Sequence, residues 1–195
     1  MMKPNFENSK LYMVKPKIID DFLSEDTFKE LESKILNDKF PWVHAEKANI
    51  MSDDEHSFQF MHHLVHKRNL IYPEAKDIVD PIMNKYIETT GETVQVTRGK
   101  VNLFIRTKPA LEMGWHSDID DRNDNYTIIL YLETSDGYTA FSRHSNDGST
   151  GRRIESIRNR AAIFPASKVH QTVTQTNCLY RRNINLNFEV INERT

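Results

Sequence analysis

The chemistry that this sequence could carry begins with the segment Trp115–Asp118, which reads Trp-His-Ser-Asp. Side chains alternate between the two faces of an extended strand, so His116 and Asp118 can reach one point in space. An imidazole and a carboxylate on one face supply two ligands of a 2-His-1-carboxylate triad, which leaves one side of an octahedral iron(II) open. A His-x-Asp triplet also arises by chance, and the alternative interpretation is a surface turn that leads into Asp120 and Asp121.

His170 is the expected third ligand. It opens the run HQTVTQ after a Phe-Pro-Ala-Ser turn, and two hairpins fit between it and Asp118. A closed β-sandwich could therefore bring this later strand back beside the first two ligands. A lone histidine in a strand is more often structural, but its position after a His-x-Asp favours a ligand. We expect an iron site made of His116, Asp118 and His170.

The strand that starts at Arg181 is expected to hold an anionic co-substrate. Alternation places apolar side chains on one face (Ile184, Leu186, Phe188) and polar side chains on the other (Arg181, Asn183, Asn185, Asn187). An arginine inside a barrel needs an anionic partner, and the C5 carboxylate of 2-oxoglutarate could form a bidentate pair with it. Alternation favours Arg181, but a one-residue slip would exchange it with Arg182, so both stay candidates.

Tyr131 is the expected second contact of that carboxylate. Thr127, Ile129 and Tyr131 alternate onto one face of the run YTIILYL, and a phenol at the floor of the barrel can donate a hydrogen bond to a carboxylate oxygen. The alternative is an ordinary core tyrosine.

The remaining histidines and the one cysteine are interpreted as structural. The segment His62–His66 lacks the glutamate of the zincin HExxH motif, so we read it as a partly exposed strand or helix face. No strand array closely follows the His44–Glu46 triplet, and His144 belongs to a polar loop. Nothing around Cys178 is arranged to activate its thiol.

Two helices are expected in the first 92 residues. Ser24 is a plausible N-cap for the first, whose apolar residues follow at helical spacing (Phe28, Leu31, Ile35). The second is expected from Pro73 to about Glu88, since proline suits a helix start and an apolar stripe follows it.

From Thr93 onward the sequence consists of short runs rich in β-branched and aromatic residues, separated by turn-forming residues. Such a pattern favours an antiparallel sandwich or barrel. We expect a mainly β fold, a double-stranded β-helix (jelly roll, cupin-like) buttressed by the two helices. The whole chain, 1–195, is expected to be one domain, with a helical buttress and first strands in 1–92 and the β-helix core in 93–190.

Bulk properties restrict the function classes. The 195 residues carry a net charge of −2, which disfavours a dedicated nucleic-acid binder, although several arginines gather in the C-terminal third. One cysteine allows no internal disulfide, and we find no apolar signal-peptide core and no run of the roughly 18–20 apolar residues that would span a membrane. These features predict a cytoplasmic protein without a membrane segment.

Several blocks, taken in order, resemble the 2-oxoglutarate/iron(II)-dependent oxygenase superfamily, in particular its prolyl-4-hydroxylase-like branch and the short single-domain members of bacteria and phages. The blocks are VNLFIRT, GWHSD, YTIILYLE with DGYTAF, NRAAIFPASKVHQT and RRNINLNF, and they cover residues 98–189. The order and spacing of the blocks are more specific than any one of them. The first 90 residues match only loosely.

The resemblance implies roles for individual residues. His116, Asp118 and His170 correspond to iron ligands, Arg181 or Arg182 to the anchor of the 2-oxoglutarate C5 carboxylate, and Tyr131 to its hydrogen-bonding neighbour. Relatives often carry a further tyrosine on the strand before the His-x-Asp triplet. Here Phe104 occupies the nearest position and lacks the hydroxyl group.

The resemblance also implies the reaction. With iron(II), 2-oxoglutarate and O2, such enzymes hydroxylate a substrate and release succinate and carbon dioxide. The expected substrate is an amino-acid side chain in a peptide, with a small molecule as an almost equal alternative. Nucleobase demethylation is disfavoured by the net charge. The alternative from another class is a jelly-roll binding module without catalytic activity.

Overall fold

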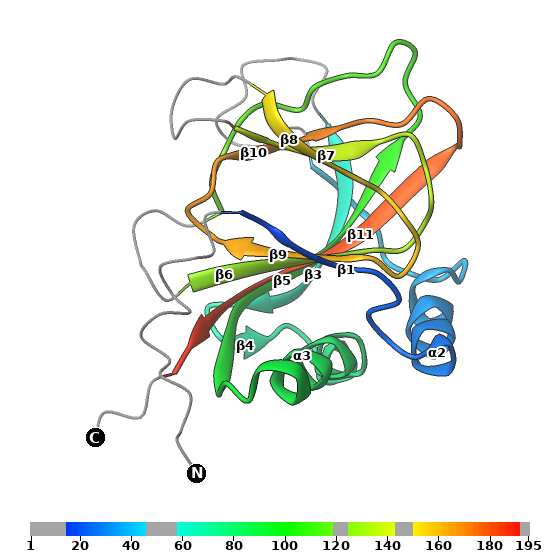
Figure 1. The fold of residues 1–195 in the computed structure, drawn as a ribbon. Coiled ribbons are helices and arrows are strands. Elements are labelled where there is room, and N and C mark those ends of the chain that lie inside the picture. The colour runs from blue at the N-terminus through cyan, green and yellow to red at the C-terminus, as the bar shows by residue number, and fades with distance from the viewer. Residues whose placement is uncertain (1–14, 46–57, 119–124, 143–149, 192–195) are drawn as a thin grey trace.

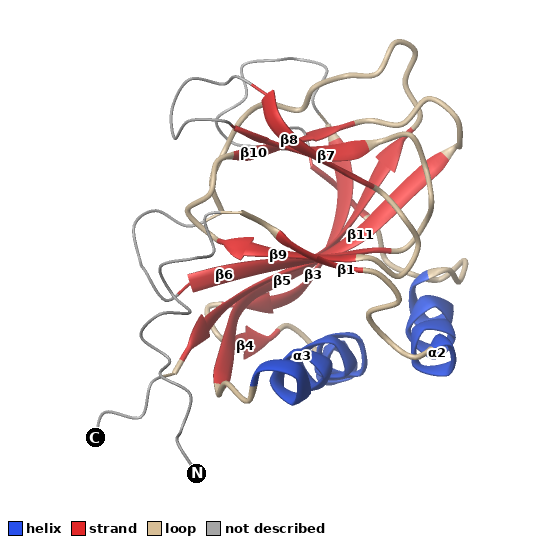
Figure 2. Cartoon of the chain, viewed as in Figure 1, coloured by secondary structure: helices blue, strands red, loops and turns tan. Residues whose placement is uncertain are grey.

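The computed structural model describes residues 15–45, 58–118, 125–142 and 150–191. Its helical elements are α2 (Glu25–Ile35), the short 3-10 helix η1 (Pro73–Ala75) and α3 (Lys76–Thr90). Its strands are β1 (Lys17–Ile19), β2 (Val43–Ala45), β3 (Gln59–His66), β4 (Asn69–Leu70), β5 (Val94–Ile105), β6 (Asn125–Tyr131), β7 (Tyr138–Ser142), β8 (Thr150–Glu155), β9 (Ala161–Pro165), β10 (His170–Val173) and β11 (Tyr180–Val190). Strands therefore dominate the described residues (Figure 2).

Two antiparallel sheets make up the β structure. The larger sheet has the order β1-β9-β6-β11-β5-β3-β2, with β4 paired to β3, and the smaller has the order β10-β7-β8. Figure 1 shows the smaller sheet facing one side of the larger sheet, while α2 and α3 lie on the opposite side. Isolated bridges from Glu112 to Val173 and from His116 to His170 place the segment 112–116 beside β10. The expected double-stranded β-helix with a helical buttress is confirmed.

The helices form where their sequence signals predict. The Ser24 side chain accepts a hydrogen bond from the Thr27 backbone N–H, and the apolar stripe of α2 is buried. The second helix begins with the 3-10 turn at Pro73 and continues to Thr90, slightly beyond the expected end. Gly91 ends it with a φ of 72°, in the left-handed region that glycine adopts at little cost.

The two faces of β11 follow the alternation that the sequence predicts. Ile184, Leu186 and Phe188 lie on the face of β11 that is turned toward the helices. They join the core cluster that also contains the buried residues of both helices. The inward polar residues are buried as well (Arg181, Asn183, Asn185, Asn187). Arg182 pairs instead with Glu133, so it does not face the interior with Arg181.

Two local expectations need correction or refinement. The His-x-Asp segment is not part of a regular strand: His116 forms one isolated bridge and Asp118 lies in a bend. Gly114, with a φ of 87°, turns the chain just before His116, which explains the irregular backbone. The ambiguous segment around His62 is a strand, β3.

Three described arginines of the C-terminal third, Arg158, Arg160 and Arg182, pair with acidic groups. Arg158 pairs with Glu25 and Glu32, and Arg160 pairs with Asp20. Their charges are thus locally balanced. None of the helices that the structure describes is long and apolar enough to cross a membrane. Glu46, Asp120, Asp121 and His144 lie outside the described residues.

Candidate metal centre

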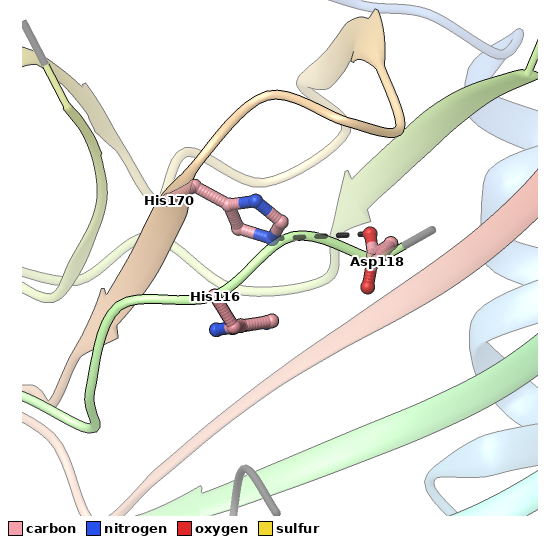
Figure 3. A group of neighbouring side chains, drawn as sticks. All are labelled: His116, Asp118 and His170. Carbon is pink, nitrogen blue, oxygen red and sulfur yellow. Dashed lines mark ion pairs between the residues drawn. The ribbon is translucent and has the colours of Figure 1, made fainter. Parts of the chain in front are cut away.

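The three expected ligands meet between the two sheets. One potential ligand atom from each of His116, Asp118 and His170 lies within 4.8 Å of the others. His170 Nε2 is 3.8 Å from Asp118 Oδ2, and the two imidazole ring centroids are 4.4 Å apart. Figure 3 shows His116 and Asp118 on one irregular segment and His170 on the adjacent strand, with the three side chains grouped together. Among the described residues this is the one group with metal-ligand geometry.

Backbone hydrogen bonds fix the two segments that carry the ligands. The His116 N–H donates to the His170 carbonyl at 2.9 Å, and the His170 N–H donates to the His116 carbonyl at 2.8 Å. The Asp118 N–H donates to the Ala166 carbonyl at 2.9 Å. Pairing to β10 thus aligns His116, and the hydrogen bond to Ala166, in the turn after β9, holds Asp118.

The outer nitrogen of each histidine is already engaged. His116 Nδ1 lies 3.2 Å from the Gly114 carbonyl, and His170 Nδ1 lies 2.8 Å from the Lys168 carbonyl. A carbonyl can only accept a hydrogen bond, so each Nδ1 carries the proton in these contacts. The lone pair of each Nε2 is then free to bind a metal, as in ligating histidines whose second nitrogen donates to a carbonyl.

A chain of hydrogen bonds orients Asp118. Thr127 Oγ1 donates to Asp118 Oδ2 at 2.8 Å, and Asn187 Nδ2 donates to Thr127 Oγ1 at 2.8 Å. Asn185 Nδ2 lies 3.4 Å from the same carboxylate oxygen. These residues project from β6 and β11 of the larger sheet, so they connect the metal centre to that sheet.

The local electrostatics favour the protonation states in which His116 and Asp118 can bind a metal. Burial, together with the neighbouring His170, lowers the pKa of His116 to about 4, so the imidazole is neutral at pH 7. Burial alone would raise the pKa of Asp118. His170, His116 and the hydrogen bond from Thr127 outweigh burial and hold that pKa well below its ordinary value. A neutral imidazole and an ionised carboxylate are the forms that bind a divalent metal.

The donor set fits iron(II). Two imidazoles and one carboxylate on one side of a site form the facial triad of non-heme iron(II) oxygenases. The Nδ1 contacts of the histidines and the Thr127 contact of Asp118 supply the outer hydrogen bonds that such ligands need.

Arg181 is a buried cation without an anionic partner among the described residues. Its side chain is fully buried, and Nη2 donates to the Val173 carbonyl at 3.1 Å. Nε and Nη1 have no hydrogen-bond partner in the part of the chain that the structure describes. The guanidinium stacks over the Phe104 ring, 4.8 Å from its centroid. A buried, half-satisfied guanidinium is costly, so this position fits a carboxylate ligand.

Gly137 holds space for Arg181. A Cβ atom at this glycine would lie 2.8 Å from Arg181 Nε and 3.0 Å from its Cδ. Both distances are shorter than a van der Waals contact, so any side chain at residue 137 would displace the guanidinium. In the sequence alone, Gly137 cannot be distinguished from an ordinary turn glycine.

The cavity beside the metal centre is narrow and polar, with a volume of about 30 Å³. His116 and His170 line it together with side chains of the larger sheet, chiefly Lys100, Asn102, Phe104, Asn183 and Asn185. Neither Arg181 nor Tyr131 lines it. Phe104 is therefore next to both the cavity and Arg181. The Tyr131 hydroxyl donates to Thr139 Oγ1 at 2.7 Å.

Lys100 was not among the expected site residues. Its ammonium lies close enough to Asp118 and His116 to influence the pKa of both. Burial lowers the pKa of Lys100 to about 8, with Arg98 adding to this effect and Asp118 opposing it, so the lysine is mostly charged at pH 7. In the run KVNLFI, Lys100, Asn102 and Phe104 alternate onto one face. That alternation could have indicated that Lys100 faces the site.

The other histidines stay outside the centre. His62 lies near the Pro41 carbonyl and the Tyr72 hydroxyl, at 2.9 and 2.7 Å, on the helical side of the larger sheet. It borders a cavity of about 310 Å³ that contains none of the three ligands. His44 packs against Phe60. Burial raises the pKa of Cys178, which agrees with an unactivated thiol.

No protein-family model matches the chain, and no curated protein matches it. Solved structures do match in fold. An oxidoreductase of the 2OG-Fe(II) oxygenase family from Burkholderia pseudomallei has a TM-score of 0.68 and 10% identity, over 96% of this chain and 92% of that one. A prolyl hydroxylase from Trichoplax adhaerens, in complex with a peptide of hypoxia-inducible factor, has a TM-score of 0.66 and 14% identity, over 93% and 86%.

A third similar structure is a viral collagen prolyl hydroxylase from Paramecium bursaria Chlorella virus-1, in complex with 2OG. It has a TM-score of 0.55 and 13% identity, over 91% of this chain and 96% of that chain. At such identities the comparisons establish a shared fold. The chain therefore has the double-stranded β-helix fold found in 2OG-Fe(II) oxygenases, with a His-Asp-His group between its sheets.

Proposed function

We propose that this protein is an iron(II)- and 2-oxoglutarate-dependent dioxygenase that hydroxylates its substrate. The observation that carries the proposal is the convergence of His116, Asp118 and His170 within 4.8 Å in this fold. Both histidines keep Nε2 for a metal, because Nδ1 is engaged with a backbone carbonyl. The buried, unpaired Arg181 adds a second feature that a 2-oxoglutarate carboxylate would complete.

In this proposal the three ligands hold iron(II), which with 2-oxoglutarate and O2 supplies the oxidising chemistry and yields succinate and carbon dioxide as co-products. The protein residues position the reactants and exclude water. Thr127 and Asn185 keep the Asp118 carboxylate directed at the metal position. No protein group is needed as a general base for hydroxylation.

Arg181 anchors the C5 carboxylate of 2-oxoglutarate in this proposal, and Tyr131 assists it. Arg182 is the weaker candidate because Glu133 already neutralises it. Arg181 does not line the narrow cavity, whereas Phe104 contacts both the cavity and the Arg181 guanidinium. Binding of 2-oxoglutarate therefore requires the Phe104 ring or its neighbours to shift so that the cavity reaches the guanidinium.

The proposed substrate is an amino-acid side chain in a peptide or a small molecule. Two structures of similar fold are prolyl hydroxylases, one of them in complex with a peptide, which supports the first choice. Nucleobase demethylation is less favoured, because Arg158, Arg160 and Arg182 are paired with acidic groups and do not form an open basic surface. We also propose a cytoplasmic location and a single domain over 1–195.

The decisive experiment is an anaerobic titration of metal-free protein with iron(II) and 2-oxoglutarate, followed by visible absorption. A weak charge-transfer band that requires both components, and that is lost in His116→Ala and His170→Ala, is the expected result. Circular dichroism of each variant checks that it is folded. A folded protein that binds neither component would refute the proposal and leave a jelly-roll binding module.

A further inference from the structure

A strip of basic side chains, whose charge is carried by Arg98 and Lys100, lies on the inner face of the larger sheet, beside the candidate metal centre. It consists of His63 and His66 on β3 and of Arg98 and Lys100 on β5. The strand register pairs His63 with Lys100 and His66 with Arg98, so each pair projects from the same face. Lys100 is also the register partner of Asn185, whose amide lies 3.4 Å from Asp118 Oδ2. We call these four residues the cationic strip.

The charges of the cationic strip are not balanced by acidic side chains of the described chain. None of its four residues forms a salt bridge there, whereas Arg68, Arg158 and Arg160 all do. Burial lowers the pKa of His63, and the neighbouring Arg98 and Lys100 lower it in the same direction. His63 Nδ1 is buried and has no hydrogen-bond partner among the described residues.

Asp118 does not neutralise the strip. It is the one described carboxylate that raises the pKa of Lys100. Its Oδ2 already accepts hydrogen bonds, and its charge is assigned to the metal. Lys100 therefore presents a partly desolvated ammonium to the site cavity without a dedicated counter-ion.

The cationic strip and Arg181 occupy opposite ends of the same inner face. Arg181 is the register partner of Phe104, while Lys100 lies four residues earlier on β5, roughly 13 Å along the strand at about 3.3 Å per residue. Between them lies the row of Asn102 and Asn183, joined by a hydrogen bond of 2.8 Å. The face thus offers two separate cationic positions, and 2-oxoglutarate needs only the one at Arg181.

We propose that the substrate carries an oxyanion, a carboxylate or a phosphate, which binds Lys100 with support from Arg98 and His63. This inference rests on the proposed function, since it names the substrate class of the same site. A partly desolvated cation beside the reaction centre attracts and orients an anionic group and disfavours a neutral one. The inference selects free amino acids, C-terminal residues or phosphorylated small molecules over an internal, uncharged peptide residue.

The test uses the iron(II)- and 2-oxoglutarate-loaded protein with nitric oxide bound in place of O2, monitored by electron paramagnetic resonance. Inorganic phosphate and acetate are the two probes, and each is titrated into wild type, Lys100→Met and Lys85→Met. Lys85 lies on α3, beside Glu88, and serves as the matched control. We expect at least one probe to perturb the wild-type and Lys85→Met spectra saturably, with the dissociation constant increased about tenfold or more in Lys100→Met.

The outcomes separate the two proposals. A response to phosphate alone identifies a phosphate-bearing substrate, and a response to acetate alone identifies a carboxylate-bearing one. A normal charge-transfer band with no saturable response to either anion would overturn the inference and leave the proposed function intact. Weaker binding of 2-oxoglutarate to Lys100→Met would also overturn it, because Lys100 would then belong to the co-substrate site. Absence of the band in wild type would instead refute the proposed function.

Discussion

Thr127 and Asp118 are joined by a hydrogen bond of 2.8 Å, from the threonine hydroxyl to the carboxylate oxygen Oδ2 that also faces His170. The hydroxyl in turn accepts a hydrogen bond from Asn187. The candidate metal centre is thereby attached to the larger sheet through a side chain that is not one of the three proposed ligands. Such outer contacts orient a ligand and tune its affinity for the metal.

Replacing Thr127 with valine should weaken metal binding by about 10- to 100-fold, the usual effect of losing an outer hydrogen bond. Valine has nearly the same shape but cannot donate to Asp118, and it leaves Asn187 without its acceptor. Thr127→Ser keeps the hydroxyl and should retain near wild-type affinity. Competition with a fluorescent chelator measures both variants, and equal affinities for valine and serine would show that the hydrogen bond is dispensable.

Arg181 and Arg182 should differ in their effect on 2-oxoglutarate. Arg181→Gln removes the buried guanidinium that lacks an anionic partner, so 2-oxoglutarate affinity should fall by about 100-fold, as expected for the loss of a buried charge pair worth about 3 kcal/mol. Arg182→Gln breaks a pair with Glu133 and should leave that affinity nearly unchanged. Calorimetric titration of the metal-loaded variants measures this contrast. The reverse order would assign the anchor to Arg182.

Gly137→Ala should impair the same site indirectly, by displacing Arg181. The added Cβ would meet Arg181 Nε at 2.8 Å, so the guanidinium must move. We expect 2-oxoglutarate affinity to fall by about tenfold, while metal binding persists. Gly99→Ala is the matched control, since its Cβ would meet Leu186 Cδ2 at 2.8 Å on the opposite face. That control should lower the free energy of unfolding and leave 2-oxoglutarate affinity unchanged. Equal affinity losses in both variants would point to a general folding defect.

The sequence predicts the structure well where the spacing of apolar residues and the residue types indicate the same arrangement. The alternation of β11 predicts both the buried polar face with Arg181 and the apolar face under the helices, because a one-residue slip would bury the wrong set. The convergence of His116, Asp118 and His170 is predictable from the His-x-Asp triplet and a later histidine at a strand start. The irregular backbone of the triplet is less predictable, since it depends on pairing to β10.

Contacts between distant strands account for what the sequence does not reveal. Thr127 and Asp118 are 9 residues apart in the chain, and Lys100 reaches the site only because β5 pairs with β11. Lys100 reads as an ordinary strand lysine until this register is known. Gly137 gains its role only from Arg181, which approaches it from another strand.

Lys100 should make stability depend on pH in a specific window. Burial lowers its pKa in the folded protein to about 8, from an ordinary value of 10.5. Between these two values the unfolded chain binds more protons than the folded protein, so the free energy of unfolding gains a contribution that rises as pH increases from 8 to 10.5. Below pH 8 the lysine is charged in both the folded and the unfolded state, so the free-energy cost of burying its charge is fully present.

Lys100→Met removes the desolvated charge and keeps a side chain of similar length. At pH 7 it should raise the free energy of unfolding by about 1–2 kcal/mol, a figure discounted from the lowered pKa because the side chain is only partly buried. It should also remove the lysine contribution to the rise above pH 8. Urea unfolding of metal-free wild type, Lys100→Met and Lys85→Met at several pH values between 7 and 10.5 measures the effect. If Lys100→Met is less stable than wild type at pH 7, the lysine has a structural partner, and its assignment to an external oxyanion loses its main support.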